Sequence, residues 1–253
     1  MLIKAELEKN LKTLRLSGMA VTIPARLQQS MDGGMSALEF LEVLIQDELD
    51  RRKDRLFERR IKLSRINAQK RLDNFEWSFN PKIPKKDLCS LATTQFIAER
   101  ENVIFIGPPG TGKSHLAQAV GLCAIHAGYH VLYYQVFELL DLIHASRHGS
   151  EWDSLLEKLL QAQLLILDDL GMKRLSAENA EDLLELVMRR YEKSSTLITS
   201  NRPIEDWSKI LGDAATTSAM LDRLMHHSHC VPFQGKSYRM EQTASFAKSR
   251  RPS

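Results

Sequence analysis

Gly107-Pro108-Pro109-Gly110-Thr111-Gly112-Lys113-Ser114 decides the fold, because it satisfies G-x-x-x-x-G-K-[ST] between an apolar run and a stretch with helical periodicity. Glycines let the backbone curl so that its N–H groups point at phosphates, and the positive end of the next helix faces them. Lys113 is expected to reach the β- and γ-phosphates, and the Ser114 hydroxyl to hold Mg²⁺. A glycine-rich turn that fits by chance is the alternative, and the flanking strand and helix argue against it. We therefore predict that these eight residues and His115 bind ATP.

An acidic pair follows a second apolar run, in Leu164-Leu165-Ile166-Leu167-Asp168-Asp169. This is a Walker B pattern, in which a buried strand ends in carboxylates. Asp168 is expected to contact Mg²⁺ through water, and Asp169 to orient or deprotonate the attacking water. Paired acids after a strand could instead cap the next helix. The phosphate loop upstream favours the nucleotide site.

A polar amide follows a third apolar run, in Thr199-Ser200-Asn201. At the end of a neighbouring strand, the Asn201 side chain would lie beside the γ-phosphate, where it could position the hydrolytic water. An Asn before Arg-Pro is also an ordinary turn former. Its place after the expected strand favours the functional interpretation.

The C-terminal two thirds of the chain alternate between short apolar runs and amphipathic stretches. The pattern predicts a helix from Leu88 to Arg100, and the apolar runs that follow are Val103–Ile106, Val131–Tyr134, Leu164–Leu167 and Thr196–Thr199. Continuous apolar strands separated by helices predict an α/β fold with a mostly parallel sheet covered on both faces. Ligands bind such sheets at the carboxyl ends of the strands.

The N-terminal third is predicted to be all-helical. Its leucines and isoleucine recur at spacings of three, four and seven, at Leu7, Leu11, Leu14, Leu38, Leu41, Ile45, Leu49, Leu56 and Leu63. Asp32-Gly33-Gly34 is a turn signal, and Ser36 with Glu39 forms a capping box that starts a long helix toward Arg71. Asn80-Pro81-Lys82-Ile83-Pro84 breaks helical periodicity. We therefore predict a small helical domain over residues 1–80 and an ATPase domain over residues 81–253.

Positive charge is concentrated in the N-terminal third. The chain of 253 residues has a net charge of +3, and residues 51–71 alone hold ten basic and two acidic residues. Such a helix could follow a phosphate backbone without sequence preference. Phe57 is the only aromatic residue of the segment, so duplex DNA is favoured over stacked single strands. The residues predicted to contact DNA are Arg51, Arg52, Arg55, Arg59, Arg60, Lys62 and Arg65.

A structural alternative for the basic segment stays open, since its cations could pair with acids on the same helix or on an adjoining subunit.

Other features of the sequence exclude several classes of protein. With 43% apolar and 26% charged residues, the composition is that of a globular protein. Three separated cysteines and the spacing of His226, His227 and His229 indicate no zinc site. No export signal or membrane-spanning run is present, so we expect a cytoplasmic protein without membrane contact.

The combined motifs resemble those of the AAA+ ATPases, over roughly residues 88–240. Within that class, several further words are similar to the IstB transposition helpers of insertion sequences, whose relatives are the DnaC-type helicase loaders. These words are LRLSGM at 14–19, HLA at 115–117, LLILDDLG at 164–171, TSNRP at 199–203, Asp206-Trp207, LDRLMHH at 221–227 and GKSYR at 235–239. The acidic-then-basic stretch from Phe40 to Arg60 is also similar, so the resemblance covers nearly the whole chain.

The resemblance implies a ring or spiral of identical subunits in which Arg223, in the LDRL word, acts as an arginine finger toward a neighbour's ATP. Considered alone, an arginine on a helix is usually a solvated surface residue. The resemblance leaves open whether Arg239, in the GKSYR word, senses the nucleotide, because little chain follows it to build the helical lid that usually carries such an arginine. Asp169 stands where the class more often has Glu, which suggests slow hydrolysis suited to a timed switch.

The function implied is that of an ATP-dependent regulator of transposition, which assembles on target duplex DNA and recruits a transposase. The transposase partner follows from the resemblance alone. A replicative helicase loader of DnaC type is the main alternative. A DNA-translocating motor is less favoured, because no strand-separating element is evident.

Overall fold

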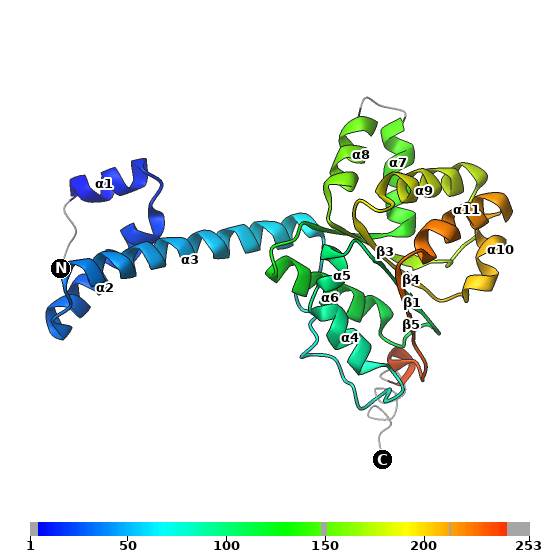
Figure 1. The fold of residues 1–253 in the computed structure, drawn as a ribbon, viewed down its shortest axis with the longest axis horizontal. Coiled ribbons are helices and arrows are strands. Elements are labelled where there is room, and N and C mark those ends of the chain that lie inside the picture. Colours follow the sequence, from blue (N-terminus) through cyan, green and yellow to red (C-terminus); the bar gives the residue numbers. More distant parts are fainter. Residues whose placement is uncertain (1–4, 148–150, 213, 242–253) are drawn as a thin grey trace, which may run out of the picture. The chain divides into compact units, whose positions relative to one another are not determined.

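The computed structural model describes residues 5–147, 151–212 and 214–241, which form two compact units, Met1–Arg59 and Arg60–Ser253 (Figure 1). The division lies upstream of the boundary predicted at Pro81, so residues 60–80 belong to the second unit. Buried contacts explain this, because Ile66 is 7% exposed and the Asn67 N–H donates to Gln118 Oε1 at 2.9 Å. Asn80-Pro81 does interrupt the helical periodicity, but the second unit begins upstream of it, at Arg60.

The described part of the N-terminal unit is helical, as predicted. It holds α1 (Ala5–Thr13), α2 (Ser17–Gly33) and the first part of α3 (Ala37–Ser64) around a small core of Leu11, Ile23 and Leu44. The turn signal ends α2, because Gly34 takes a left-handed conformation with φ 64°. The capping box is formed as predicted: Ser36 N–H donates to Glu39 Oε2 at 2.8 Å, and Glu39 N–H to Ser36 Oγ at 3.3 Å.

The close approach of α2 to α3 explains why residue 18, near the start of α2, is a glycine. A Cβ there would lie 2.7 Å from the Glu48 Cα, so only glycine lets α2 approach α3 this closely. The Glu48 side chain bridges the two helices. Its Oε2 accepts the Gly18 N–H at 2.5 Å, and its Oε1 accepts the Arg52 Nε–H at 2.7 Å. These bonds hold the buried carboxylate in its charged form, and its pKa is lowered despite burial.

The long helix ends at Ser64, short of the predicted extension toward Arg71. Arg65 has a left-handed backbone with φ 64°, and the Ser64 Oγ accepts the Ile66 N–H at 3.1 Å, which closes the last turn. Ile66 is buried within the second unit, and the helix ends before it although the apolar spacing continues. Of the basic segment, Arg65, Lys70 and Arg71 therefore lie outside the helix.

The second unit is built on one parallel sheet. Its strands in the described chain are β1 (Asn102–Ile106), β2 (Val131–Gln135), β3 (Leu164–Leu170), β4 (Ser195–Ser200) and β5 (Ser228–Pro232), in the order β2-β3-β4-β1-β5. Each neighbouring pair is parallel. The four predicted strands are confirmed, and their carboxyl ends meet at one edge, where the phosphate loop leaves β1. The fifth strand was not predicted as part of the sheet.

Helices cover both faces of the sheet (Figure 1). One side carries α4 (Lys85–Ala92), α5 (Gln95–Ala98) and α6 (Lys113–His126). The other carries α7 (Val136–Arg147), α8 (Trp152–Gln161), α9 (Ala177–Arg190), α10 (Trp207–Leu211) and α11 (Ala214–Met225), with a short 3₁₀ turn η1 (Ile204–Asp206). The main core lies between these last helices and the strands.

The helix predicted from Leu88 to Arg100 is two helices, α4 and α5. Thr94 between them has a left-handed backbone with φ 66°, which interrupts the helix, and α4 begins earlier, directly after Pro84. The break lets both helices bury their apolar residues, since Leu88, Leu91 and Phe96 are all under 5% exposed. In the parts of the chain that the structure describes, no helix has the length and apolar character needed to cross a membrane.

Candidate nucleotide site

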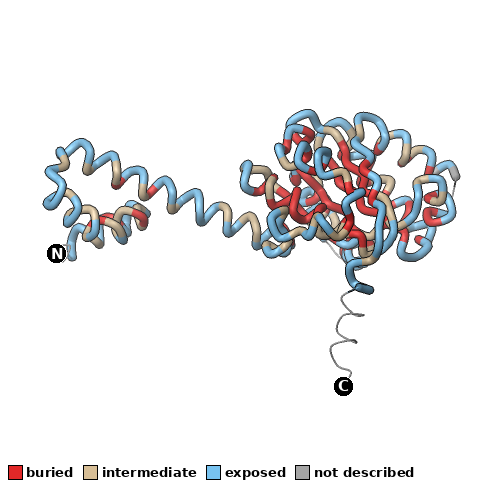
Figure 2. Tube along the Cα trace, turned by 90° about the horizontal axis from the view of Figure 1, so that it is seen from below, coloured by how far each residue is buried: buried red, intermediate tan, exposed pale blue. Residues whose placement is uncertain are grey.

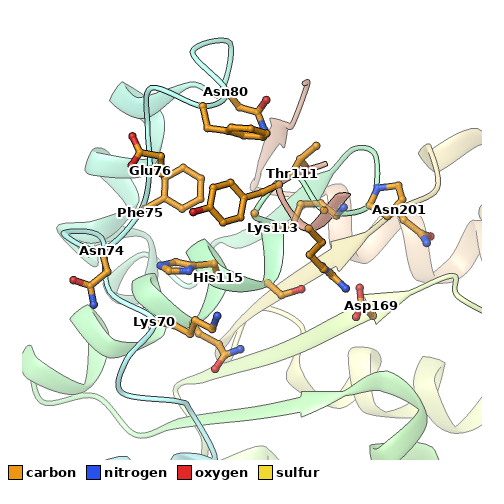
Figure 3. A pocket seen from close by; sticks show the side chains of 18 of the residues that line it. Lys70, Asn74, Phe75, Glu76, Asn80, Thr111, Lys113, His115, Asp169 and Asn201 are labelled. Atoms are coloured by element: carbon orange, nitrogen blue, oxygen red, sulfur yellow. The ribbon is translucent and has the colours of Figure 1, made fainter. Parts of the chain in front are cut away.

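A cavity of about 550 Å³ lies in the second unit, at the carboxyl ends of the central strands (Figure 3). Phe75 and His115 lie along one side of it, and Lys113, Asp169 and Asn201 along the other. The residues lining it are Lys70, Asn74, Phe75, Glu76, Phe79, Asn80, Pro109, Gly110, Thr111, Gly112, Lys113, Ser114, His115, Gln118, Asp169, Met172, Asn201, Tyr238 and Arg239. Most of the sequence-predicted nucleotide residues are therefore brought together in one place.

The loop between β1 and α6 forms the floor of the cavity. Lys113 is the first residue of α6, and its ammonium donates to the carbonyls of Gly107 at 2.7 Å and Pro108 at 2.9 Å. Those two residues do not line the cavity themselves. Burial lowers the pKa of Lys113, while the carboxylates Asp168 and Asp169 oppose the shift. The loop thus holds a half-desolvated cation at the amino end of a helix, an arrangement that favours phosphate.

Asp168 lies within β3, which continues to Leu170 and so extends beyond the predicted strand Leu164–Leu167. It is 1% exposed and is not among the residues that line the cavity. Its Oδ2 accepts the Tyr133 hydroxyl at 2.6 Å, and its Oδ1 accepts the Thr199 hydroxyl. Tyr133 lies on β2 and Thr199 on β4, so both neighbouring strands orient this carboxylate. Neither positioning residue was predicted, because their contacts depend on strand order, which no local pattern specifies.

Asp169 points into the cavity from a left-handed backbone with φ 61°, which an aspartate tolerates better than most residues. Its N–H donates to Thr199 Oγ1 at 3.0 Å, so one hydroxyl orients both acids. Burial raises the pKa of Asp169, and the charge of Asp168 raises it further, against the effects of Lys113 and Arg239. A carboxylate with a raised pKa is a better proton acceptor than an exposed aspartate.

Asn201 follows β4 and lines the cavity beside Asp169. Its Oδ1 is buried and accepts no hydrogen bond from any residue that the structure describes. A buried polar atom without a partner is costly, so such an atom in a cavity is suited to a ligand or water. The alternative prediction, an ordinary turn residue, does not explain the burial of this oxygen.

The wall of the cavity that faces the loop between β1 and α6 was not predicted from the sequence. Residues 70–80, which we assigned to the helical domain, wrap against the loop: the His115 ring lies 5.4 Å from the Phe75 ring, and His115 Nε2 is 2.8 Å from Arg71 O. Gly112 permits the approach, because its φ is 104° and a Cβ would lie 2.5 Å from Phe75 Cε2. The aromatic spacing in Asn74-Phe75-Glu76-Trp77-Ser78-Phe79 was the available signal.

The C-terminal segment completes the wall. Tyr238 N–H donates to Gly110 O at 2.9 Å, and the Tyr238 ring meets the Phe79 ring edge-on at 5.0 Å. Asn80 ties the two segments together, donating to Lys236 O and accepting from Lys236 N–H, both at 3.0 Å. Arg239 consequently lines the cavity, although no lid was expected to carry it there.

Arg223 does not line the cavity of its own chain. It lies near the end of α11, half-buried, and donates to Ala219 O at 3.1 Å and to Asp222 Oδ2 at 3.3 Å. Any role in ATP chemistry would therefore be played toward another subunit.

The predicted DNA-contacting cations differ in their surroundings. Arg52 pairs with Glu48, Arg55 donates to Ser17 Oγ at 2.7 Å, and Arg65 pairs with Glu138 at 3.2 Å. Arg51 has a buried Nε, whereas Arg59 and Lys62 are exposed and Arg60 is half-buried. Arg52 therefore pairs with an acid of its own helix, as the alternative describes, whereas the acid beside Arg65 lies on α7.

The oxygen donors near the cavity are of the type that Mg²⁺ prefers, namely hydroxyl and carboxylate groups. Ser114 lines the cavity, and the Asp168 oxygens each accept one hydrogen bond, which leaves each a second lone pair. Ser114 and Asp168 therefore have the donor chemistry that fits a magnesium ion.

Comparison with known proteins agrees with this geometry. Residues 9–246 match the family described as IstB-like ATP binding protein. A Pseudomonas aeruginosa protein, whose name places it in insertion sequence IS21 and describes it as a candidate ATP-binding protein, is 36% identical over 237 residues. That match covers 94% of this chain and 89% of the relative.

Solved structures show the same fold. The crystal structure of the DnaC helicase loader matches with a TM-score of 0.51 at 22% identity, covering 62% of this chain and 98% of that one. AMPPCP-bound DnaA from Aquifex aeolicus matches with a TM-score of 0.57 at 18% identity, covering 73% and 56%. The second unit therefore has the fold of a P-loop AAA+ domain, and, with nearly its whole length matched, the chain belongs to the family of IstB-like ATP binding proteins.

Proposed function

We propose that this chain is an ATPase of insertion-sequence transposition, which assembles on target duplex DNA when it binds ATP, presents a surface to a transposase, and is released by hydrolysis. The observation that carries the nucleotide part is the meeting of Lys113, Asp169 and Asn201 in one cavity. The transposition part rests on family membership and on the insertion-sequence relative.

The cavity suggests how ATP would lie. The triphosphate would contact the loop N–H groups and Lys113, replacing the carbonyls that the ammonium now contacts. The base would meet the aromatic wall of Phe75, Phe79 and Tyr238, whose faces and edges suit a purine. Arg239 would add a second positive charge near the phosphates.

Hydrolysis would use the acidic pair. Ser114 and Asp168 would hold Mg²⁺, which supplies charge neutralisation for the phosphates when bound. Asp169, with its raised pKa, would accept a proton from the attacking water, and the Asn201 side chain would orient that water. Tyr133 and Thr199 would keep Asp168 in place.

The proposal is tested by sedimentation of the full chain with random duplex or single-stranded DNA, each with ATP·Mg²⁺ or with ADP. We expect large complexes on duplex with ATP and none with ADP, because subunit assembly would require the γ-phosphate. Preference for single strands would contradict this and favour the helicase-loader alternative, for which the DnaC likeness offers a fold only.

Two double variants, compared in duplex binding at several salt concentrations, locate the DNA contacts. Arg55→Gln with Arg59→Gln should weaken duplex binding regardless of sequence and flatten the log–log salt dependence by about 2, near 0.9 for each lost phosphate contact. Lys9→Gln with Lys12→Gln removes the same charge from exposed positions of α1 and should leave the slope unchanged. Equal slopes for the two double variants would move the DNA site off α3.

Arg223→Ala should leave ATP binding by single subunits unchanged and lower turnover of the assembled protein about 100-fold. The physical reason is that an arginine supplied across an interface stabilises charge that develops during phosphoryl transfer. Turnover is measured with duplex DNA present. Arg189→Ala, at an exposed position of α9, is the control. Unchanged turnover of the Arg223 variant would remove the finger role.

A further inference from the structure

The outer face of α3 carries an apolar stripe in the N-terminal unit. Leu44 and Phe40 turn inward to the core, whereas the stripe residues are 43 to 67% exposed; they are Leu38, Leu41, Ile45, Leu49 and Leu56. Exposed surface runs along most of this helix in Figure 2. An aligned set of exposed large apolar side chains marks an interaction surface rather than scattered surface residues.

The spacing of the stripe residues suits packing against another helix, and we call this contact surface the seam. At 3.6 residues per turn, the five side chains fall within a sector of about 80° and extend over about 27 Å. Leu38 and Ile45 are seven residues apart, as are Leu49 and Leu56, which places them at the d and a positions of a heptad. Such a seam is suited to a second helix with the same repeat.

The distribution of charge along α3 indicates which helix would pair with it, and in which orientation. Residues 37–50 of α3 hold five acids and no basic residue, whereas residues 51–59 hold five basic residues and two acids. Two copies of α3 placed parallel would set like charges together. Placed antiparallel, the acidic half of each faces the basic half of the other.

One antiparallel register satisfies both patterns. With Ile45 opposite Leu49 of a second copy, Leu38 lies opposite Leu56 and Glu42 lies opposite Arg52. Positions a and d thus face each other in every layer, as antiparallel pairing requires. Arg52 already bonds Glu48 in its own chain at 2.7 Å, so Glu42 of the second copy would extend an existing ion pair.

We propose that α3 forms an antiparallel helix pair with α3 of a second copy of this chain, through Leu38, Ile45, Leu49 and Leu56, with Glu42 and Arg52 setting the register. The contact is two-fold symmetric, because the same surface serves both copies. It lies in the N-terminal unit and does not depend on nucleotide, so it stands or falls separately from the proposed ATPase function.

Self-association is measured by sedimentation equilibrium of the full chain without nucleotide or DNA. We expect a dimer, and Ile45→Glu with Leu49→Glu should weaken it about 100-fold, because four carboxylates would enter the seam. Leu14→Glu with Val21→Glu is the matched control, since these residues are 66% and 61% exposed but lie outside the stripe. Far-UV circular dichroism verifies that all variants fold. A monomeric wild type, or equal effects of both double variants, would overturn the proposal.

Disulfide trapping tests the direction, in a background with Cys89, Cys123 and Cys230 replaced by serine. A mixture of Leu38→Cys and Leu56→Cys chains should cross-link under mild oxidation, while Leu38→Cys chains alone should not, because their sulfurs would lie about 27 Å apart. Cross-linking of Leu38→Cys alone would show a parallel pair and contradict the register. No cross-link in the mixture would remove the contact.

Discussion

Lys113→Ala is expected to lower the affinity for ATP about 1000-fold. The ammonium is buried within the phosphate loop, where it lies at 2.7 Å from Gly107 O and could make charge-assisted bonds to the β- and γ-phosphates instead. Two such bonds at about 2 kcal/mol each account for a loss of this size. Equilibrium binding of a fluorescent ATP analogue by the full chain measures it.

The matched control is Lys86→Ala, which removes the same charge from an exposed position of α4. Thermal unfolding verifies that the loop variant folds, since loss of Lys113 also frees two loop carbonyls. Undiminished affinity of Lys113→Ala would show that the cavity does not bind phosphates through this loop. The proposal of ATP-driven assembly would then lose its basis.

Asp169→Asn is expected to lower ATP turnover about 1000-fold while ATP binding is kept. The amide has the size of the carboxylate but cannot accept a proton, and a positioned general base contributes roughly 100- to 10,000-fold. Removal of a negative charge beside the phosphates should not weaken binding. Steady-state phosphate release and nucleotide affinity, measured on the same preparation, separate the two effects.

The pH dependence of turnover provides a second readout for Asp169. Burial and the neighbouring Asp168 charge raise its pKa, so the base form is lost at a higher pH than for an exposed aspartate. Turnover should therefore fall as pH is lowered through that raised pKa, and the residual turnover of Asp169→Asn should lack this step. A variant with wild-type turnover, or with the same acid limb, would assign the proton transfer to another group.

The proposed helix pair gives the N-terminal unit a role that differs from DNA contact alone. Arg52 would serve the seam, while Arg55 and Arg59 remain for phosphate contacts. The double variants of α3 distinguish these roles, because Ile45→Glu with Leu49→Glu acts on self-association in the absence of DNA. Arg55→Gln with Arg59→Gln acts on the salt dependence of duplex binding.

Local patterns in the sequence were sufficient for several elements. Four buried strands were predicted because uninterrupted apolar runs suit a sheet covered on both faces, and the start of α3 because Ser36 and Glu39 satisfy each other's backbone groups. The loop between β1 and α6 was predicted because its glycines follow an apolar run and precede a helical pattern, and its binding of phosphate stays a prediction. In each case the signal lies within a few neighbouring residues.

Tertiary contacts decided the rest. The end of α3 at Ser64 follows from Ile66, which is buried within the second unit. The cavity wall follows from Phe75 and Tyr238, which approach the loop from segments far apart in the chain. Tyr133 and Thr199 orient Asp168 only because β2 and β4 flank β3. The sequence alone determined the four buried strands and the start of α3, since those signals are local. Which residues surround the predicted phosphate loop depends on packing between distant segments, which only the folded chain defines.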